Sequence, residues 1–394
     1  MKILHVIPSI GPLRGGPSFV IRTMSEGLAA LGCDIDVVTT DDNGPERLDV
    51  PLGRPVSERR VTYWYFRRQM RFYTVSWPLF QWLRQRVPDY DVLHIHALFS
   101  FATGAAAYQA RRYRVPYVVR PLGTLNRWGM ENRRPWLKQA SLRLIDRRVL
   151  SGAAAVHYTS EEEREEGALA ACPQRPVIIP NPVNFEFARL SSGWLNAHYP
   201  STVRKRIILF FSRLHPKKGI DLLLSAFAQV RARVPDVALV FGGTGERDFM
   251  EQLRRQAHDL GIEQDVVWAG FLEGDAKHAA MAEAEMFVLP SYSENFGVAV
   301  VEAMGAGLPV IVSDCVGIHR EVSAARAGLV VPCQEKPLAD AILQMLENPG
   351  LRQEAARNAR NLAETFTAAR VCERLVHLYS EIAHSANRKE AVDA

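Results

Sequence analysis

The sequence predicts an α/β protein built from two doubly wound domains. Its 394 residues correspond to two or three domains at a typical size of about 150 residues each. Hydrophobic residues make up 47% and charged residues 23%, a balance typical of a globular protein with a sizeable core. Short apolar runs rich in Val, Ile and Phe alternate with longer segments of helical period, once in each half of the chain. The repetition indicates two parallel sheets, each covered by helices.

The apolar runs place the strands of both sheets. In the first half we predict strands at residues 3–8, 35–39, 61–66, 92–96, 117–120, 154–158 and 177–179. In the second half we predict them at residues 207–212, 237–241, 266–269, 286–289, 310–312 and 329–331. Ligands of such sheets bind beyond the carboxyl ends of the strands, so the loops that follow the strands are where a site is expected.

Helical periodicity is clearest in three segments. Residues 18–31 carry an apolar stripe that ends at Gly32, and residues 219–230 repeat this pattern in the second half. Residues 371–383 form an amphipathic helix that must dock on the protein. A proline-punctuated connection at residues 180–184 separates the halves. We therefore predict an N-terminal domain at 1–185, a second domain at 186–370, and a C-terminal helix and tail at 371–394 that returns toward the N-terminal domain.

Basic residues are concentrated in the first half. Residues 1–185 contain 25 basic and 17 acidic residues, whereas the rest contains 23 and 26. Such an excess attracts nucleic acid, an acidic substrate or an anionic membrane. Residues 54–86 combine eight Arg with many aromatic residues, and residues 111–148 add 11 basic residues, a composition that suits a bilayer interface. We hypothesise peripheral docking of this domain on a membrane; a solvated arginine-rich face over an aromatic core is the alternative.

The cysteines and the N-terminus indicate an intracellular location. The five cysteines, an odd number with no C-x-x-C, indicate neither a disulfide framework nor a zinc knuckle; they are Cys33, Cys172, Cys315, Cys333 and Cys372. The apolar run at residues 1–8 is too short for a signal peptide, and no segment reaches the roughly 20 apolar residues of a membrane-spanning helix. We expect a cytoplasmic protein, either free or docked on the inner face of the membrane.

A glycine-rich loop follows the first predicted strand. Gly15 and Gly16 precede a helix directly, so backbone amides and the helix N-terminus could approach a phosphate. The spacing is not the G-x-G-x-x-G of dinucleotide-binding proteins, which leaves a plain structural turn as an equal interpretation.

The fourth predicted strand ends with two histidines. His94 and His96 point to one face of a regular strand, and His96 lies nearer the carboxyl end. A pair of metal ligands is conceivable, but no third ligand stands at a suggestive spacing. We predict that His96 hydrogen-bonds a substrate, and that His94 is a core residue.

Two cations follow the first strand of the second half. Arg213 and Lys218 stand five residues apart directly before a helix, an arrangement that suits a diphosphate. A Walker A sequence is absent, so a triphosphate loop is not predicted. A solvated basic turn is the alternative.

The most specific signal lies at residues 291–305. Glu294 and Glu302 stand eight positions apart after the strand at 286–289, so both can address one extended ligand. Glu302 lies in an apolar run, where an unpaired charge is costly, and we expect it to have hydroxyl or amide partners from a ligand or a neighbouring loop. The backbone of Asn295, Phe296 and Gly297 can offer donors to an anion or to sugar hydroxyls.

These two glutamates with Asn-Phe-Gly between them form an E-x7-E signature, and with it the whole chain resembles a retaining glycosyltransferase of family four with the GT-B fold. The Gly-Gly loop, His96, the Pro-Asn linker, Arg213 with Lys218, and Gly243 fall in the order of that family. The resemblance implies two facing Rossmann-like domains with a donor site in the cleft between them.

The resemblance also implies roles for the residues. Arg213 and Lys218 would neutralise the diphosphate of a nucleotide sugar, and Glu302 would hold the ribose. Glu294 would bind the transferred sugar, helped by the backbone at 295–297. The remaining donor contacts, as the resemblance implies them, are Gly15, Gly16, Gly243 and the loop at Phe271, with His96 bordering the reacting sugar.

The implied reaction moves a sugar to a saccharide or lipid-linked acceptor with retention, in surface polysaccharide assembly such as that of lipopolysaccharide or exopolysaccharide. The leaving diphosphate helps to deprotonate the acceptor hydroxyl. Neither a metal nor another cofactor is required, because Arg213 and Lys218 stabilise the negative charge of the leaving group. The Asp34-Ile35-Asp36 motif is interpreted as a strand edge rather than a metal site. A nucleotide-sugar epimerase of the same fold is the alternative, followed by a dehydrogenase and an inactive binding module.

Overall fold

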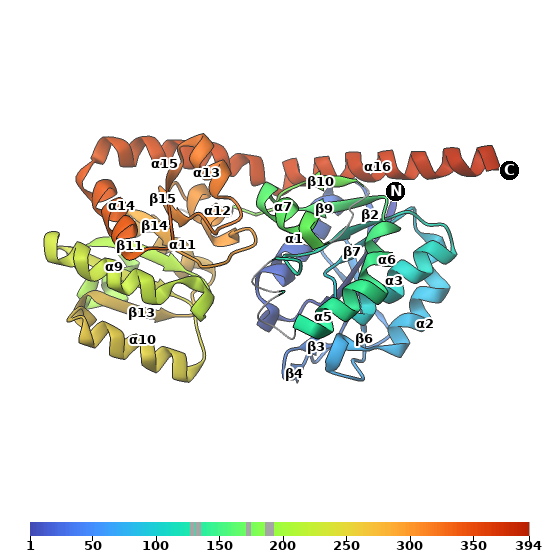
Figure 1. Ribbon diagram of the computed structural model, residues 1–394, viewed down its shortest axis with the longest axis horizontal. Helices are drawn as coiled ribbons and strands as arrows, with labels where there is room; N and C mark the ends of the chain where they lie inside the picture. The colour runs from blue at the N-terminus through green and yellow to red at the C-terminus, as the bar shows by residue number, and fades with distance from the viewer. Residues whose placement is uncertain (127–129, 131–134, 171–174, 186–192, 394) are drawn as a thin grey trace. The chain divides into compact units, whose positions relative to one another are not determined.

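A computed structural model of the chain describes residues 1–126, 130, 135–170, 175–185 and 193–393. The chain forms two compact units (Figure 1). Unit 1 comprises Met1–Pro182 together with Ala368–Ala394, and unit 2 comprises Val183–Thr367. The sequence placed these boundaries at 185 and 370. Cys172 and residues 127–129 and 131–134 of the arginine-rich segment lie outside the described residues.

Unit 1 is built on an eight-stranded sheet in the order β10-β9-β8-β7-β1-β2-β6-β5. All neighbours pair in parallel except β5 and β6, which are antiparallel. The strands are β1 (Lys2–Ser9), β2 (Asp34–Thr40), β5 (Pro55–Glu58), β6 (Val61–Phe66), β7 (Val92–His96), β8 (Tyr117–Arg120), β9 (Ala155–Tyr158) and β10 (Pro176–Ile178), with a separate ribbon of β3 (Asp42–Asn43) and β4 (Glu46–Arg47). The central strands β1 and β7 are almost wholly buried, as near-continuous apolar runs predict.

Unit 1 also contains seven described helices. They are α1 (Gly16–Ala30), α2 (Trp77–Arg86), α3 (Phe101–Arg112), α5 (Pro135–Ser141), α6 (Arg147–Ser151), α7 (Glu161–Ala170) and α16 (Ala368–Asp393). The last of them, α16, packs against α1 although hundreds of residues separate them. Its apolar stripe of Val371, Leu375, Tyr379 and Ile382 is buried, which confirms the predicted docking on the N-terminal domain. None of the described helices combines the length and the apolar content that a membrane crossing requires.

Unit 2 contains a six-stranded parallel sheet in the order β13-β12-β11-β14-β15-β16. Its strands are β11 (Arg206–Phe211), β12 (Val237–Gly242), β13 (Val266–Gly270), β14 (Met286–Leu289), β15 (Val310–Ser313) and β16 (Gly328–Val331). Its helices are α8 (Trp194–His198), α9 (Ile220–Arg233), α10 (Arg247–Asp259), α11 (Gly274–Glu283), α12 (Val298–Gly305), α13 (His319–Ala325), α14 (Glu335–Glu347) and α15 (Pro349–Ala363). Strand order reverses between β11 and β14, and such a switch point opens a crevice at the carboxyl edge.

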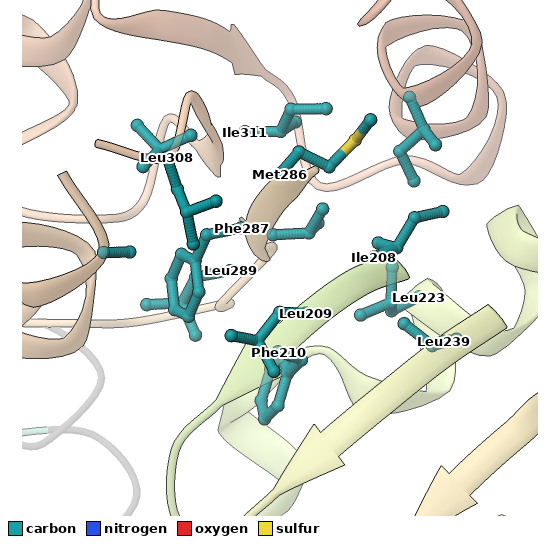
Figure 2. Close-up of a cluster of buried hydrophobic side chains, with 14 of the residues drawn as sticks. Ile208, Leu209, Phe210, Leu223, Leu239, Met286, Phe287, Leu289, Leu308 and Ile311 are labelled. Carbon is teal, nitrogen blue, oxygen red and sulfur yellow. The ribbon is translucent and has the colours of Figure 1, made fainter. Parts of the chain in front are cut away.

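The core of unit 2 fixes this edge. Figure 2 shows Leu209 and Phe210 of β11 beside Phe287 and Leu289 of β14, all of them buried. Leu223 of α9 lies beside Ile208 and Leu239 in the same hydrophobic core (Figure 2). Full burial of such a side chain contributes roughly 1.5–3 kcal/mol, so the strands that carry the loops of the edge are firmly held.

The predicted strands are confirmed, most of them within one residue at each end. The antiparallel edge strand β5 was not predicted because Pro55-Val-Ser-Glu contains one large apolar residue and begins with proline. Asp34 and Asp36 lie at the start of β2, where Asp36 accepts a hydrogen bond from Trp64 Nε1 at 3.3 Å. This placement confirms the interpretation of that motif as a strand edge.

Candidate functional site

The loops after β11, β12 and β13 converge at the carboxyl edge of the unit 2 sheet. Leu214 N donates to Thr244 O at 2.8 Å, and Gly243 N donates to Gly270 O at 2.6 Å. These backbone bonds bring the turn of Arg213, the Gly243 loop and the turn before Phe271 together. Arg213 is exposed, and Phe271 keeps 63% of its surface accessible. An exposed aromatic ring beside a fixed backbone edge suits a flat ligand group.

Gly243 makes this close approach possible. Its φ is +142°, a conformation that side chains with a Cβ rarely adopt, and a Cβ built there would lie 1.8 Å from the carbonyl oxygen of Ser212. The backbone of β11 cannot move away easily, because Ser212 N also donates to Gly242 O at 3.0 Å. Glycine is therefore required for the two loops to touch.

Gly243→Ala is expected to lower the free energy of unfolding of unit 2 by about 2–5 kcal/mol, the sum of backbone strain and overpacking. Urea denaturation followed by tryptophan fluorescence measures the change. Gly350→Ala is the matched control, because a Cβ at Gly350 meets no heavy atom within 4 Å. Equal stability of the Gly243→Ala and wild-type proteins would contradict the close approach.

Lys218 and Glu294 form an ion pair across the switch point of the sheet. Lys218 ends the short turn Pro216–Lys218 after β11, and Glu294 follows β14; the ammonium donates directly to Glu294 Oε2. Burial, together with the nearby positive charges of Lys217 and Arg213, lowers the pKa of Lys218, and the carboxylate opposes that shift. The structure thus brings together two residues that the sequence placed 76 positions apart.

Glu302 pairs with a lysine that the sequence analysis did not identify. On α12, Glu302 Oε1 lies 2.6 Å from Lys277 Nζ of α11, and the same ammonium lies 4.9 Å from the centre of the Phe211 ring. The sequence analysis did not anticipate this ion pair with a helix residue, and the expected hydroxyl contacts of Glu302 with a ligand stay a prediction. The Lys277 side chain keeps 19% and the Glu302 side chain 24% of its surface exposed, so both can reach a ligand.

The segment between the two glutamates is locked in place. Glu294 N donates to Cys315 O at 3.0 Å, and Gly317 N donates to Glu294 O at 2.8 Å, which ties the segment to the loop after β15. Phe296 is buried edge-on against the Phe366 ring at 5.7 Å between centroids. Gly297, with φ of +97°, begins α12. Asn295 lies between these anchors, so its backbone is held next to the Glu294 carboxylate.

In unit 1, the glycine loop begins α1. A short turn at Pro12–Arg14 precedes Gly15, whose φ is +74°, and the helix starts at Gly16. A Cβ at Gly16 would meet no heavy atom within 4 Å, so the surface beside it is open. Ser18 Oγ donates to Gly11 O at 2.8 Å and closes the loop. The geometry permits an approaching anion without identifying one.

His96 does not border a surface, which corrects the sequence expectation. Its side chain is fully buried, its Nε2 lies 2.9 Å from His5 Nδ1, and the two rings stack at 5.2 Å. His94 is also buried, and its Nδ1 lies 2.6 Å from Tyr379 Oη on α16. Burial lowers the pKa of both rings. In this arrangement His96 can position neighbouring groups but cannot itself touch a sugar.

A third histidine beside His94 and His96, which the spacing along the chain did not reveal, comes from the neighbouring strand β1. One ring nitrogen each of His5, His94 and His96 lies within 4.8 Å of the others. The guanidinium of Arg120 is also fully buried nearby and contributes to the lowered pKa of each ring. The same positive charge disfavours a divalent cation, so we interpret the cluster as a neutral hydrogen-bonded network.

Comparison with known proteins assigns the family. Residues 15–182 match the family described as "Glycosyl transferase 4-like domain", and residues 197–362 match "Glycosyl transferases group 1". The chain is 26% identical to an uncharacterized glycosyltransferase of Methanocaldococcus jannaschii, covering 96% of this chain and 98% of that protein. It is also 26% identical to the D-inositol 3-phosphate glycosyltransferase of Jonesia denitrificans, covering 93% and 92%.

Solved structures share the fold. HepE of Anabaena, crystallised in complex with UDP and glucose, matches with a TM-score of 0.78 at 22% identity, covering 97% of this chain and all of that one. Sucrose-phosphate synthase of Thermosynechococcus elongatus also matches at 0.78, with 21% identity and coverage of 98% and 100%. Both unit architectures are those of GT-B glycosyltransferases, and the epimerase alternative finds no support among these matches. The chain belongs to the group 1 glycosyltransferases, as a member of family-four type with the GT-B fold.

Proposed function

We propose that the chain transfers a sugar from a nucleoside-diphosphate sugar to a saccharide or lipid-linked acceptor with retention of anomeric configuration. The observation that carries the proposal is the Lys218–Glu294 pair across the switch point of the unit 2 sheet. A buried cation and a partly exposed carboxylate at one edge suit a ligand that combines an anionic diphosphate with hydroxyl groups.

The charged residues of this edge suit different parts of the donor. Arg213 is exposed on the same turn as Lys218 and lies close enough for its charge to lower the Lys218 pKa. These two cations would stabilise negative charge as it grows on the leaving diphosphate. Glu294 would accept hydrogen bonds from the transferred sugar, and Glu302 with Lys277 would hold the ribose end.

Neither carboxylate is proposed as the nucleophile. Glu294 is held by Lys218, and Glu302 is held by Lys277. We propose instead that the diphosphate oxygen takes the proton of the acceptor hydroxyl while the acceptor oxygen attacks the face that the diphosphate leaves. The bond from the anomeric carbon to the diphosphate breaks, the bond to the acceptor forms, and configuration is retained. The two cations make a divalent metal unnecessary in this scheme.

The names of two relatives support a polar or lipid acceptor. The D-inositol 3-phosphate glycosyltransferase and the phosphatidyl-myo-inositol mannosyltransferase of Mycobacterium leprae act on small or lipid-borne acceptors by their names; the second is 33% identical over 54% of this chain. We propose a role in surface polysaccharide assembly on the cytoplasmic side, with unit 1 in peripheral contact with the membrane.

Purified protein incubated with labelled UDP- and GDP-sugars tests the proposal. A saccharide product with the donor's anomeric configuration by NMR, formed equally well in the presence of EDTA, is the expected result. Product of inverted configuration, or activity that requires an added metal, would refute the corresponding part. Hydrolysis without transfer to any acceptor would refute the transferase assignment of this edge.

Glu302→Gln is expected to raise the KM for the donor about tenfold with little change in kcat, because ribose contacts are the same in the ground and transition states; this corresponds to about 1.4 kcal/mol. Steady-state kinetics with the verified donor measures both constants. Glu347→Gln, which alters an exposed pair with Arg233 in the same unit, is the control. A change confined to kcat would contradict the ribose assignment.

A further inference from the structure

Unit 1 contains an open apolar groove of about 820 Å³. The turn of Phe72, Tyr73 and Val75 forms one wall, and residues of α5 and of the π-helical segment Leu142–Asp146 form the other. Its volume is in the range of pockets that bind small molecules. Nothing in the proposed donor edge of unit 2 uses this groove.

Large apolar side chains of the groove are exposed. The exposed fractions of Phe72 and Leu144 are 50% and 69%, and Ile145 keeps 42%. Contiguous exposed apolar surface of this kind marks a binding site rather than an ordinary solvated face. Each square ångström that a ligand covers contributes roughly 25 cal/mol. An apolar chain is therefore the chemistry that the walls favour.

The groove is built from a constrained backbone. Tyr73 and Phe99 both line it, and both adopt positive φ, 58° and 55°, which is unfavourable for residues with a Cβ. Hydrogen bonds hold them: Tyr73 Oη bonds to Ser141 Oγ, and Phe99 N donates to Asp146 Oδ1 at 3.1 Å. Ser141 Oγ in turn donates to Asp146 Oδ2 at 2.5 Å. The buried carboxylate of Asp146 thus fixes both walls, so the groove is pre-formed.

The charge around the groove is positive. Lys138 lines it, with its ammonium 5.5 Å from the centre of the Phe99 ring. The flanking segments add the exposed residues Arg71 and Arg143. Asp146 is the only acidic residue at positions 67–76 and 135–148, and its carboxylate is buried. A ligand with an anionic head complements this surface, whereas a second copy of the chain would bring the same positive charge against it.

We propose that this groove binds the hydrocarbon chain of a single anionic lipid, a prenyl or acyl phosphate, with the phosphate near Lys138. In this proposal the lipid carries the acceptor sugar, which makes the acceptor lipid-linked rather than a free saccharide. The assignment of the lipid as carrier of the acceptor sugar rests on the proposed transferase function, whereas the binding of the lipid in the groove does not.

Isothermal titration with farnesyl phosphate, inorganic phosphate and farnesol tests the proposal on the full-length protein. Farnesyl phosphate below its critical micelle concentration is expected to bind at least tenfold more tightly than either of the other two. Leu144→Gln/Ile145→Gln should weaken that binding at least tenfold, because it replaces two exposed apolar side chains. Leu260→Gln, an exposed apolar position of unit 2, is the matched control and should bind as the wild type does.

Lys138→Gln tests the contribution of the phosphate separately from that of the hydrocarbon chain. It should weaken farnesyl phosphate binding severalfold and leave farnesol binding unchanged. Farnesyl phosphate that binds no better than inorganic phosphate, or that binds Leu144→Gln/Ile145→Gln as tightly as wild type, would overturn the proposal. The proposal would also be overturned if the variants lost binding to anionic vesicles but still bound monomeric farnesyl phosphate. The same holds if the variants abolished a dimer seen in solution.

Thermal shift with UDP and GDP on the same variants keeps the two proposals apart. If nucleotides bind nowhere but farnesyl phosphate still binds in the groove, the donor assignment of unit 2 fails and the lipid site stands. If nucleotides bind and farnesyl phosphate does not, the reverse holds.

Discussion

Lys218→Ala is expected to lower kcat/KM for the nucleotide-sugar donor at least a hundredfold. A charge-assisted hydrogen bond to a developing charge contributes about 1.5–3 kcal/mol, and the loss of the Glu294 partner adds to it. Lys218 is one of the few charged side chains of unit 2 with almost no exposed surface, so water does not replace the missing ammonium well. Steady-state kinetics with a verified donor measures the loss.

The matched control for this variant is Lys336→Ala. Lys336 also pairs with a carboxylate, Asp340 at 2.8 Å, but its side chain is 79% exposed, so activity should be unchanged. The double variant Lys218→Ala/Glu294→Ala should lose little more than Lys218→Ala alone, because the two residues act as one unit. Full activity of Lys218→Ala with an intact circular-dichroism spectrum would remove Lys218 from the donor site.

Unit 1 is expected to lose about 4 kcal/mol of unfolding free energy between pH 7 and pH 5 from two buried histidines alone. Burial lowers the pKa of His5 and of His157 to about 3. Below pH 6.5 the unfolded chain therefore binds protons that the folded chain excludes, so stability is fully present above pH 6.5 and is lost as the pH falls toward 3. Hydrogen exchange followed peptide by peptide measures this loss in β1 and β7, with β11 and β14 of unit 2 as the internal reference.

His157→Gln tests the source of that loss. His157 Nε2 lies 2.7 Å from Ile179 O, and its Nδ1 lies 3.3 Å from His94 Nε2. Its replacement should reduce the pH slope by about one proton, or roughly 1.4 kcal/mol per pH unit. His377→Asn changes an exposed histidine of the same unit and should leave the slope as it is. An unchanged slope in His157→Gln would show that the buried histidines do not carry the acid sensitivity.

Much of this architecture follows from the sequence because strand signals are local. Runs such as residues 92–96 and 286–289 are short and rich in aliphatic residues, and β7 and β14 have those bounds. The convergence of Lys218 with Glu294 could also be anticipated, because parallel strands place the loops after them at one edge. These inferences need the order of the elements but no detail of packing.

The features that sequence reasoning missed depend on packing between distant elements. Lys277 reaches Glu302 from α11, which packs against α8 and β11, and no spacing along the chain predicts that contact. His96 is buried because His5 on β1 covers it, and its neighbour His94 meets Tyr379, which lies 285 residues further along the chain. The rule that ligands bind beyond the carboxyl ends of parallel strands predicts which loops lie together. It does not predict which side chains of those loops face solvent.

The return of α16 to unit 1 has a consequence for biosynthesis. Residues 183–367 form one continuous body, so that body can finish folding as soon as it leaves the ribosome. The amino-terminal body must wait for residues 368 onward, because Tyr379 and Cys372 close its interior against His94 and Gly27. The part of the protein that is translated first is completed last, and a premature stop codon near residue 367 would damage the amino-terminal body rather than the one beside the stop.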